Sequence, residues 1–399
     1  MFALLSRLYK IFYPPVVPKA DAPIRFGILG AAAIAPPALV LPAKSHPEVV
    51  LKGVAARDRS RAEKFAREHG VEKVYDSYED LLTFTLSDLL NDPEIDAIYN
   101  PLPNGLHYEW TMRALAAGKH VLCEKPMADT AEEVREMFAL AEEKNLVLLE
   151  AFHYRFHPAA QKAKAILDSG ELGAVQSTEI QFQLPPGIIK AGDIRYDLAL
   201  GGGVMMDVGC YAMNILRFLT GAEPTAVLAA AHEPPPFPAD PKIDHRSTAA
   251  LAFPRDVTGS LSVDFGRRKV WGVIPPLPNI RAIVRCAGGE LELVNFVFPT
   301  VWHYIQVRPK VGAQRTEKAY TYKEAGMEGK GEDWWLTYRY QLEAFVDALK
   351  GRKPAHWISK EDSISNLTWI EEVYKKTGYG PRPRSEFKIG GLNCFFSGL

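Results

Sequence analysis

Cysteine is scarce in this chain of 399 residues, which contains only four. Cys123, Cys210, Cys286 and Cys394 lie far apart, without the short spacing that metal ligands show. A fold that depended on disulfides would need more cysteines at closer spacing. We therefore expect reduced thiols, a cytoplasmic location and no bound metal.

A long apolar run and a charge excess are also missing. No apolar run is long enough to span a bilayer, so no membrane partner is expected. The formal net charge of −1 gives no reason to expect a nucleic acid as a partner. With 47% hydrophobic and 24% charged residues the composition is that of a globular protein, and 399 residues favour two domains.

Residues 1–22 form an N-terminal extension. Apolar residues recur there at helical spacing, at Leu4, Leu5, Leu8, Ile11 and Phe12. Arg7 and Lys10 interrupt the apolar core that a secretory signal needs, and no cleavage site is evident. We expect a short amphipathic helix that packs on its own protein or on a partner. Organelle targeting and contact with a membrane surface remain alternatives.

The apolar run 24–29 ends at Gly30 and is followed by Ala31-Ala32-Ala33-Ile34-Ala35. A strand, a glycine turn and an opening helix begin a dinucleotide-binding fold, because the amides at the helix start face the pyrophosphate. The later glycine positions of this motif hold Ala32 and Ala35, so the motif alone is a weak signal. The candidate cofactor contacts here are Gly30, Ala32, Ala33 and Ile34.

The end of the second strand, 49–55, bears on cofactor choice. A fold selective for NAD places an acidic residue there, whereas this chain continues with Ala56 and Arg57, and Arg59 and Arg61 follow. Guanidinium groups bind phosphate in a charge-assisted way, which suits the 2′-phosphate of NADP. We expect NADP with Arg57 as a contact, and NAD remains possible. The alternative is that these arginines only solvate the next helix.

Strands and helices alternate up to about residue 152. We expect further strands at 73–75, 95–99, 121–123 and 146–151, and helices at 60–69, 77–90, 104–117 and 129–144. Such alternation predicts a Rossmann domain with a doubly wound parallel sheet, over residues 23–152. Asn104 is the expected cap of the helix 104–117.

The pattern changes after residue 152. Strand-like runs follow one another with few helices between them, at 177–184, 226–231, 247–253, 259–265, 280–286 and 290–297. This favours an α+β domain with a large, mostly antiparallel open sheet over residues 153–380, for substrate binding and dimerisation. Helices are expected at 157–169, 207–219, 334–349 and 360–376, and residues 381–399 form a tail.

Two charged motifs are candidates for chemistry. Glu124-Lys125-Pro126 follows the fifth strand, and ligands bind beyond the carboxyl ends of such strands. In isolation this motif is more typical of a surface ion pair. Asp207 and Tyr211 are four residues apart and share a face of the expected helix. The alternative is that Asp207 is an N-cap and Tyr211 a packed aromatic.

Four motifs in this order resemble the Gfo/Idh/MocA family of oxidoreductases. They are residues 27–32, residues 99–104 with His107, residues 124–126 and residues 207–211. Tyrosine at 211, together with residues 154–158 and 194–197, resembles the branch of dimeric dihydrodiol dehydrogenases and fungal D-xylose 1-dehydrogenases. Ala32 in the nucleotide loop is a departure from the pattern, and residues 83–90 lengthen a loop that is usually shorter.

The resemblance implies hydride transfer between a carbinol carbon and a nicotinamide. It makes Tyr211 the candidate acid/base, with Lys125 expected to lower its pKa and to polarise the substrate oxygen, and Asp207 as an orienting group. Whether Lys125 or Tyr211 carries the proton stays open. Further expected cofactor contacts are Pro101, Asn104, His107, Glu124 and Lys125. Weaker candidates for the substrate rim are Arg155, Arg195 and His153.

The expected activity is that of an NADP-dependent dehydrogenase of a sugar or diol, with D-xylose as the first substrate. A trans-1,2-dihydrobenzene-1,2-diol dehydrogenase or a dicarbonyl reductase is the alternative within the same class. A non-catalytic NADP-binding regulatory protein is the alternative of another class, because a fold does not fix a function. By analogy with the family it resembles, an exposed sheet face in the second domain makes a homodimer the expected assembly.

Overall fold

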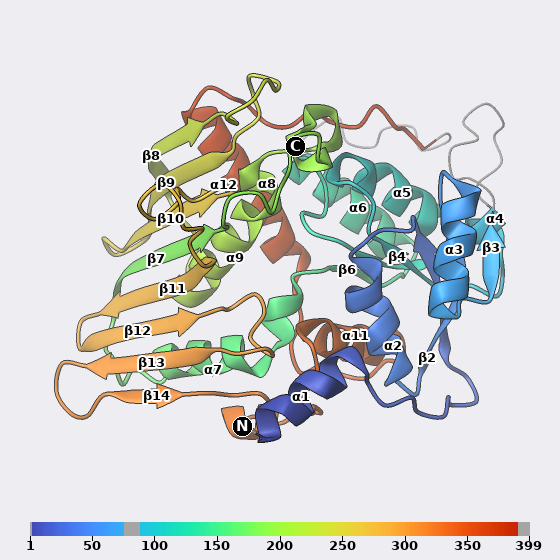
Figure 1. The fold of residues 1–399 in the computed structure, drawn as a ribbon, viewed down its shortest axis with the longest axis horizontal. Coiled ribbons are helices and arrows are strands. Elements are labelled where there is room, and N and C mark those ends of the chain that lie inside the picture. The colour runs from blue at the N-terminus through green and yellow to red at the C-terminus, as the bar shows by residue number, and fades with distance from the viewer. Residues whose placement is uncertain (1, 76–87, 390–399) are drawn as a thin grey trace.

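Two sheets organise the chain, sheet A on the right of Figure 1 and sheet B on the left. The computed structural model describes residues 2–75 and 88–389. Sheet A is built before residue 151 and sheet B after residue 174. The candidate active site, described below, lies between the two sheets. The order of the strands therefore decides which side chains reach it.

Sheet A has six parallel strands in the order β3-β2-β1-β4-β5-β6. The strands are β1 (Ile24–Leu29), β2 (Val49–Ala55), β3 (Lys73–Tyr75), β4 (Ala97–Asn100), β5 (His120–Cys123) and β6 (Leu148–Glu150). This order places a topological switch point between β1 and β4, where a doubly wound sheet binds its ligand. The predicted Rossmann sheet is confirmed.

Helices surround sheet A. They are α2 (Leu41–Lys44), preceded by a short π-helix at Pro36–Val40, then α3 (Arg59–His69), α4 (Asp88–Asn91), α5 (Asn104–Ala116) and α6 (Ala131–Glu143). The Asp58 carboxylate starts α3 by accepting the amides of Ser60 and Arg61. In α6 the Thr130 and Glu133 side chains form a reciprocal capping box.

Two predicted features of the sheet A half are the Asn104 cap and the helix 77–90. Asn104 is not the cap of its helix, because Pro103 occupies the N-cap position and Asn104 is the first helical residue. Its side-chain amide instead donates to the Gly201 carbonyl at 3.1 Å, in the other half of the chain. Of the expected helix 77–90, only the part within α4 can be compared. Residues 76–87, with most of the extra loop length at 83–90, lie outside the described residues.

Sheet B has eight strands in the order β14-β13-β12-β11-β7-β10-β9-β8. They are β7 (Val175–Gln183), β8 (Ala226–Glu233), β9 (Arg246–Ala252), β10 (Thr258–Asp264), β11 (Asn279–Cys286), β12 (Gly289–Val294), β13 (Tyr304–Pro309) and β14 (Arg315–Glu317). All of the pairs are antiparallel except β7 with β10. The predicted mostly antiparallel sheet is confirmed.

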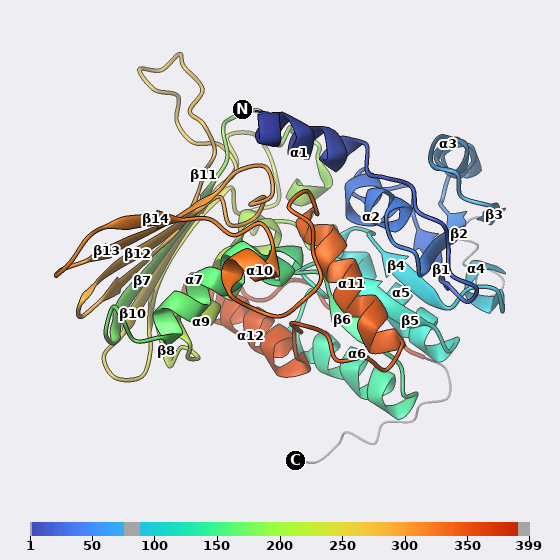
Figure 2. The same cartoon turned by 90° about the horizontal axis from the view of Figure 1, so that it is seen from below.

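Helices cover one face of sheet B (Figure 2). The helices of this half are α7 (Pro158–Asp168), α8 (Val204–Asp207), α9 (Gly209–Thr220), α10 (Tyr322–Ala325), α11 (Thr337–Leu349) and α12 (Lys360–Lys376). Contacts of α7, α9 and α12 with the strands form this layer. Alternating burial along β7 and β11 agrees with a sheet whose two faces differ in environment.

The expected helix 207–219 is broken at Val208. Asp207 is the last residue of α8, so it is not an N-cap, and Gly209 begins α9. Within the described part of the chain no single helix is long and apolar enough to cross a membrane. The bent pair Leu198–Asp207 and Gly209–Thr220, with 44° between its parts, meets that test by length and composition only.

The N-terminal extension contains the expected helix, α1 (Phe2–Phe12), which packs on its own chain. The Arg7 guanidinium lies 3.7 Å from the centre of the Tyr320 ring and donates to the Val301 carbonyl at 3.4 Å. Ile11 is buried against the protein. The helix is therefore fixed beside the loop that precedes β13.

Candidate active site

A cavity of about 1370 Å³ opens beyond the carboxyl ends of the sheet A strands. The loop after β1, the loop after β4 and the loop after β5 supply one wall. Residues of α8, α9 and sheet B supply the other. The cavity therefore lies at the switch point between β1 and β4, where the topology predicts a bound dinucleotide.

The nucleotide loop fits a dinucleotide. Gly30 has φ 83°, a left-handed conformation that favours glycine, and its amide donates to the Ala55 carbonyl at 2.6 Å. A Cβ at Gly30 would lie 3.0 Å from Leu102 Cδ2, so a side chain would crowd the loop after β4. The predicted contacts that line the cavity beside this turn are Ala32, Ala33, Ile34, Pro101 and Asn104.

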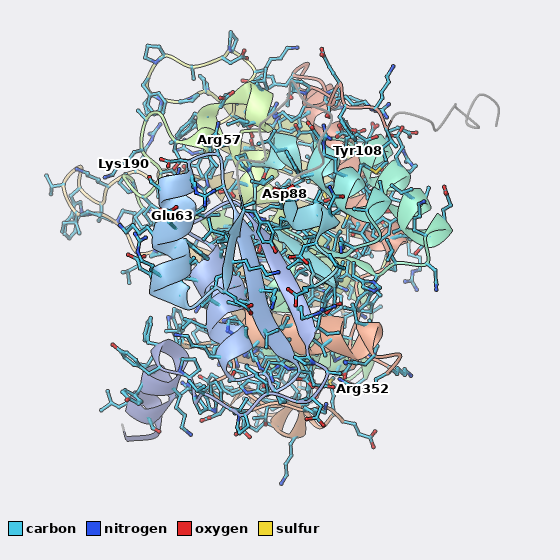
Figure 3. All side chains as sticks on the ribbon, turned by 90° about the vertical axis from the view of Figure 1, so that its right-hand side faces the viewer. Arg57, Glu63, Asp88, Tyr108, Lys190 and Arg352 are labelled. Carbon is cyan, nitrogen blue, oxygen red and sulfur yellow. The ribbon has the colours of Figure 1, made fainter. Side chains whose placement is uncertain are left out.

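Arg57 follows β2 and is exposed, outside the residues that line the cavity. In Figure 3 it lies close to the upper end of α3, and Glu63 lies farther down that helix. Arg61, on the first turn of α3, donates to the Ala31 carbonyl of the nucleotide loop at 3.4 Å. Two cations therefore lie near the end of β2, where a ribose 2′-substituent would be read.

Lys125, Asp207 and Arg195 form one charged cluster on the cavity wall. Lys125 Nζ lies 2.9 Å from Asp207 Oδ1, and Arg195 Nε lies 2.7 Å from Asp207 Oδ2. Burial would raise the pKa of Asp207, but the charges of Lys125 and Arg195 outweigh it and lower the pKa to about 2. Arg195 also pairs with Asp193, its Nη1 lying 3.0 Å from Oδ1, so Asp207 is the carboxylate that both cations of the cluster share.

Lys125 stays an ammonium in this environment. Burial would lower its pKa, but the neighbouring charges, chiefly that of Asp207, raise it above the ordinary lysine value. An ammonium with one hydrogen bond to the Asp207 side chain and one to the Asp207 carbonyl is held in a fixed place. Such a group can stabilise negative charge that develops on a substrate oxygen.

The Tyr211 hydroxyl lies 2.9 Å from Nε2 of His153, and Nδ1 of His153 lies 2.8 Å from the Thr337 hydroxyl. Lys125 Nζ lies over the Tyr211 ring, 4.8 Å from its centre. Burial raises the pKa of Tyr211 well above its ordinary value. The expectation that Lys125 lowers this pKa is therefore wrong, because removal from water outweighs the ammonium.

His153 is neutral in the site, because burial lowers its pKa to about 3. With its hydrogen on Nδ1, the ring accepts the hydroxyl hydrogen of Tyr211 at Nε2. With its hydrogen on Nε2, it donates to the Tyr211 oxygen and leaves the Tyr211 hydrogen for another acceptor. The ring of Tyr338 packs on His153 at 4.0 Å between centres and also lines the cavity.

Glu124 and His107 lie beside the cavity with protein partners of their own. Glu124 is buried, and its Oε1 accepts the Tyr99 hydroxyl at 2.7 Å. His107 Nδ1 lies 2.8 Å from the Pro126 carbonyl, and its Nε2 lies 2.7 Å from the Leu102 carbonyl. Burial lowers the pKa of His107 to about 4, so the neutral ring donates its one N–H to one of these carbonyls while it packs between the loops after β4 and β5.

Arg155 is not at the rim of the cavity. It donates to Asp362 at 2.9 Å and to Asn214 at 3.1 Å, and it packs over the Phe218 ring at 3.9 Å. The weak assignment of Arg155 to the substrate is corrected, because these contacts join the 3-10 turn His153–Phe156 to α9 and α12, and Arg155 is not among the residues that line the cavity. Of the two other weak candidates, Arg195 lines the cavity and binds Asp207, whereas His153 contacts Tyr211 from behind the lining.

Sequence reasoning did not single out Arg61, Thr337 and Tyr338 as site residues. Thr337 and Tyr338 lie at the start of α11, far along the chain from His153, and no motif marks them. The sequence marks Arg61 only as a cation four residues after Arg57. Among residues 2–75 and 88–389 no group of three or more His, Cys, Asp or Glu side chains is placed to hold a metal ion.

The fold and cavity define a dinucleotide-binding enzyme, and comparison with known proteins gives its family. Residues 24–152 match the family model described as "Oxidoreductase family, NAD-binding Rossmann fold". Residues 160–292 match that of the "GFO/IDH/MocA C-terminal domain". The chain belongs to the Gfo/Idh/MocA family of oxidoreductases, which confirms the predicted family, the enzyme class and the nicotinamide dinucleotide as cofactor.

Several relatives are informative. The chain is 35% identical to "D-xylose 1-dehydrogenase (NADP(+)) 2" of Haloferax volcanii, over 89% of this chain and 98% of that protein. It is 34% identical to the trans-1,2-dihydrobenzene-1,2-diol dehydrogenase of Macaca fascicularis, over 56% and 61% of the two chains. The 3-ketoreductase of Actinomadura kijaniata, solved with NADP and TDP-benzene, matches with a TM-score of 0.72 and 26% identity, over 89% and 98% of the chains.

Proposed function

We propose that this protein is an NADP-dependent dehydrogenase of a sugar carbinol, with D-xylose and related aldoses as the first candidate substrates. The observation that carries the proposal is the cluster of Lys125, Asp207 and Arg195 beside Tyr211, in the cavity at the switch point of sheet A. The nearly full-length similarity to a D-xylose dehydrogenase supports the sugar. Both lines of support are needed, because a fold hosts many substrates.

The nicotinamide dinucleotide, when bound, supplies or accepts the hydride. The turn at Gly30 with Ala32, Ala33 and Ile34 would hold the pyrophosphate. Pro101, Asn104 and Glu124 would line the nicotinamide half. This division follows from the order of the loops along the switch point, with the loop after β1 before those after β4 and β5.

Lys125 binds the substrate oxygen as an ammonium and stabilises the negative charge that develops there. Asp207 and Arg195 position Lys125 and the substrate hydroxyls. The raised pKa of Tyr211 makes it a neutral phenol, which donates its hydrogen to the substrate oxygen in the direction of reduction. The phenolate that reduction leaves on Tyr211 accepts a hydrogen bond from Nε2 of His153 and regains its proton from water, and oxidation runs the same steps in reverse.

The preference for NADP rests on two features of the chain. Ala56 follows β2 where an NAD-selective fold has an acidic residue, and Arg57 and Arg61 lie close by. The Haloferax relative is an enzyme of NADP(+). Guanidinium groups at this place favour a 2′-phosphate over a 2′-hydroxyl.

A second candidate function is the oxidation of a trans-dihydrodiol or the reduction of a dicarbonyl. One observation favours it, because apolar side chains line the outer part of the cavity, among them Ile188, Phe298 and Trp302. The macaque relative supports the same alternative over about half of the chain. A non-catalytic regulatory role is disfavoured, since the charged cluster and Tyr211 have the arrangement that proton transfer needs.

The domain division at 23–152 and 153–380, the cytoplasmic location and the homodimer are part of the proposal. The face of sheet B opposite α7, α9 and α12 is the expected dimer surface. Sedimentation velocity of the full chain tests the dimer, and a purely monomeric boundary at all concentrations would dismiss it.

A substrate panel tests the activity. D-xylose, other aldoses, a trans-dihydrodiol and a dicarbonyl are each assayed with NADP and with NAD, by the absorbance of the reduced nicotinamide. We expect the highest kcat/KM for an aldose with NADP. A higher value for the dihydrodiol would favour the second candidate, and turnover of none of them would favour the regulatory role.

A further inference from the structure

The outer side of α1 is apolar and exposed. Leu5, Tyr9 and Phe12 are spaced so that they form one stripe along the helix, and Tyr9 is 65% and Phe12 64% exposed. Tyr13 and Val16, just after the helix, are exposed as well. A helix that packs on its own protein normally buries its apolar stripe, whereas α1 is held through Arg7 and Ile11 and turns its stripe outward.

The loop between β10 and β11 has the same character. It projects from sheet B with a small bridge between Val270 and Ile274, and Trp271 lies at its tip with 87% of its surface exposed. Val273 is exposed too, and Leu277 is 83% exposed. An isolated exposed apolar residue needs no explanation, but five within eight positions of one loop form a patch.

The helix and the loop lie on the same side of the molecule. Figure 2 shows α1 and this loop at the same upper edge of the protein. Arg7 joins α1 to Val301, and Val301, Val270 and Leu277 all line the mouth of the cavity. We call this surface the apolar face; it consists of Leu5, Tyr9, Phe12, Tyr13, Val16, Val270, Trp271, Val273, Ile274, Leu277 and Trp302.

The two chain segments that carry most of the apolar face contain only basic charges. Residues 1–20 and 265–289 contain no aspartate or glutamate, although the whole chain has 48 acidic and 47 basic residues. Lys10 and Lys269 are exposed, as is Arg268. Within residues 2–75 and 88–389 none of these three side chains forms an ion pair. The two projecting segments therefore combine apolar and aromatic side chains with unneutralised cations.

We propose that the apolar face binds the surface of a bilayer that contains anionic phospholipid. Tryptophan and tyrosine favour the interface between water and lipid, aliphatic side chains enter the acyl boundary, and lysine and arginine attract anionic headgroups. A second copy of the chain fits this face less well, because a twofold contact would bring like charges together. The proposal replaces the expectation that no membrane partner exists, and it concerns surface contact without a spanning helix.

The test is co-sedimentation of the full chain with vesicles of phosphatidylcholine, with and without phosphatidylserine. We expect the wild type to pellet with the anionic vesicles and much less with the neutral ones. Lys10→Glu and Lys269→Glu should each weaken the partition about fivefold or more, since one basic residue near such a surface contributes about 1 kcal/mol. Trp271→Ser with Tyr9→Ser should remove most binding to either vesicle.

Matched controls separate this contact from a general effect. Val311→Ser and Lys376→Glu change equally exposed residues on other elements, and they should pellet like the wild type. Turnover of a soluble substrate reports that each variant is folded, since none of the changed residues lines the cavity. Equal recovery of the wild type with and without phosphatidylserine overturns the proposal. So does self-association that the face variants abolish while vesicle binding is absent, because the face is then a protein interface.

Discussion

Lys125 Nζ lies 2.9 Å from the carboxylate of Asp207 and 2.9 Å from its backbone carbonyl, although 82 residues separate the two in the chain. This pair joins the end of β5 in sheet A to the end of α8, which lies between strands β7 and β8 of sheet B in the chain. The ammonium is thereby fixed between the two halves of the chain. An isolated lysine on a loop would lose much of its effect to motion and water.

Replacing Lys125 by methionine tests whether its positive charge is needed for turnover. Lys125→Met keeps an unbranched chain of similar length but removes the ammonium, so kcat should fall about 100- to 1000-fold, as for the loss of one preorganised donor. The measurement is steady-state turnover of the best sugar with NADP. Lys162→Met is the matched control, because Lys162 pairs with Glu317 outside the cavity and should keep full turnover. Full activity of Lys125→Met would remove the assignment.

Tyr211→Phe tests the proton donor. The change removes the hydroxyl that contacts His153 but keeps the ring, so kcat for reduction should fall about 100-fold or more. In the wild type the raised pKa of Tyr211 keeps the phenol protonated, so this rate should not decline until the pH exceeds the ordinary tyrosine range. The pKa of His153, about 3, predicts no decline on the acid side from this ring near neutrality.

The pH profile of the reduction rate is the measurement, and His153→Gln is its second arm. That variant keeps a hydrogen-bonding group beside Tyr211 and should retain more activity than Tyr211→Phe. A basic limb with an apparent pKa near neutrality that disappears in Tyr211→Phe would contradict a neutral phenol and restore the lowered pKa that the sequence suggested.

Asp207 should contribute to stability only while it is ionised. Its pKa is lowered from 3.8 to about 2 in the folded chain, so the contribution is present above pH 4 and is lost as the pH falls toward 2. We expect about 2 kcal/mol of unfolding free energy to disappear over this window. Urea unfolding of wild type and Asp207→Asn at several pH values measures it, with Asp168→Asn on the exposed side of α7 as control. A parallel pH dependence in all three proteins would contradict the prediction.

Much of the fold could be predicted because its signals are local. The alternation of apolar runs with helices gives the sheet A strands, and the close spacing of runs after residue 174 gives sheet B. The end of α8 could not be predicted, since Val208 continues an apolar pattern, and Asp207 beside the break contacts Lys125 and Arg195, of which Lys125 is 82 residues away in the chain. Local propensity does not contain such tertiary contacts.

The site residues that lie in recognisable sequence motifs could be predicted. Lys125, Asp207 and Tyr211 lie together in the cavity, as the family resemblance implied, although their roles stay proposals. Arg155 was assigned from its place in a motif, whereas its guanidinium pairs with Asp362, some 207 residues later in the chain. The environment of Tyr211 also depends on burial among distant side chains, so the direction of its pKa could not be read from the neighbouring lysine alone.

Arg57 at the end of β2 should decide the preference for NADP over NAD. Arg57→Ala removes a cation at the end of β2, so KM for NADP should rise about 10- to 100-fold while KM for NAD changes little, because a charge-assisted hydrogen bond to phosphate has no counterpart in NAD. Arg61→Ala should act in the same direction, with a smaller effect if its bond to the Ala31 carbonyl also shapes the nucleotide loop. Arg67→Ala, in the last turn of the same helix, is the control and should leave both KM values unchanged. The ratio of the two KM values is the deciding quantity, since a general loss of folding or of loop geometry raises both. An equal rise for NADP and NAD in Arg57→Ala would mean that this guanidinium supports α3 and does not read the 2′-phosphate.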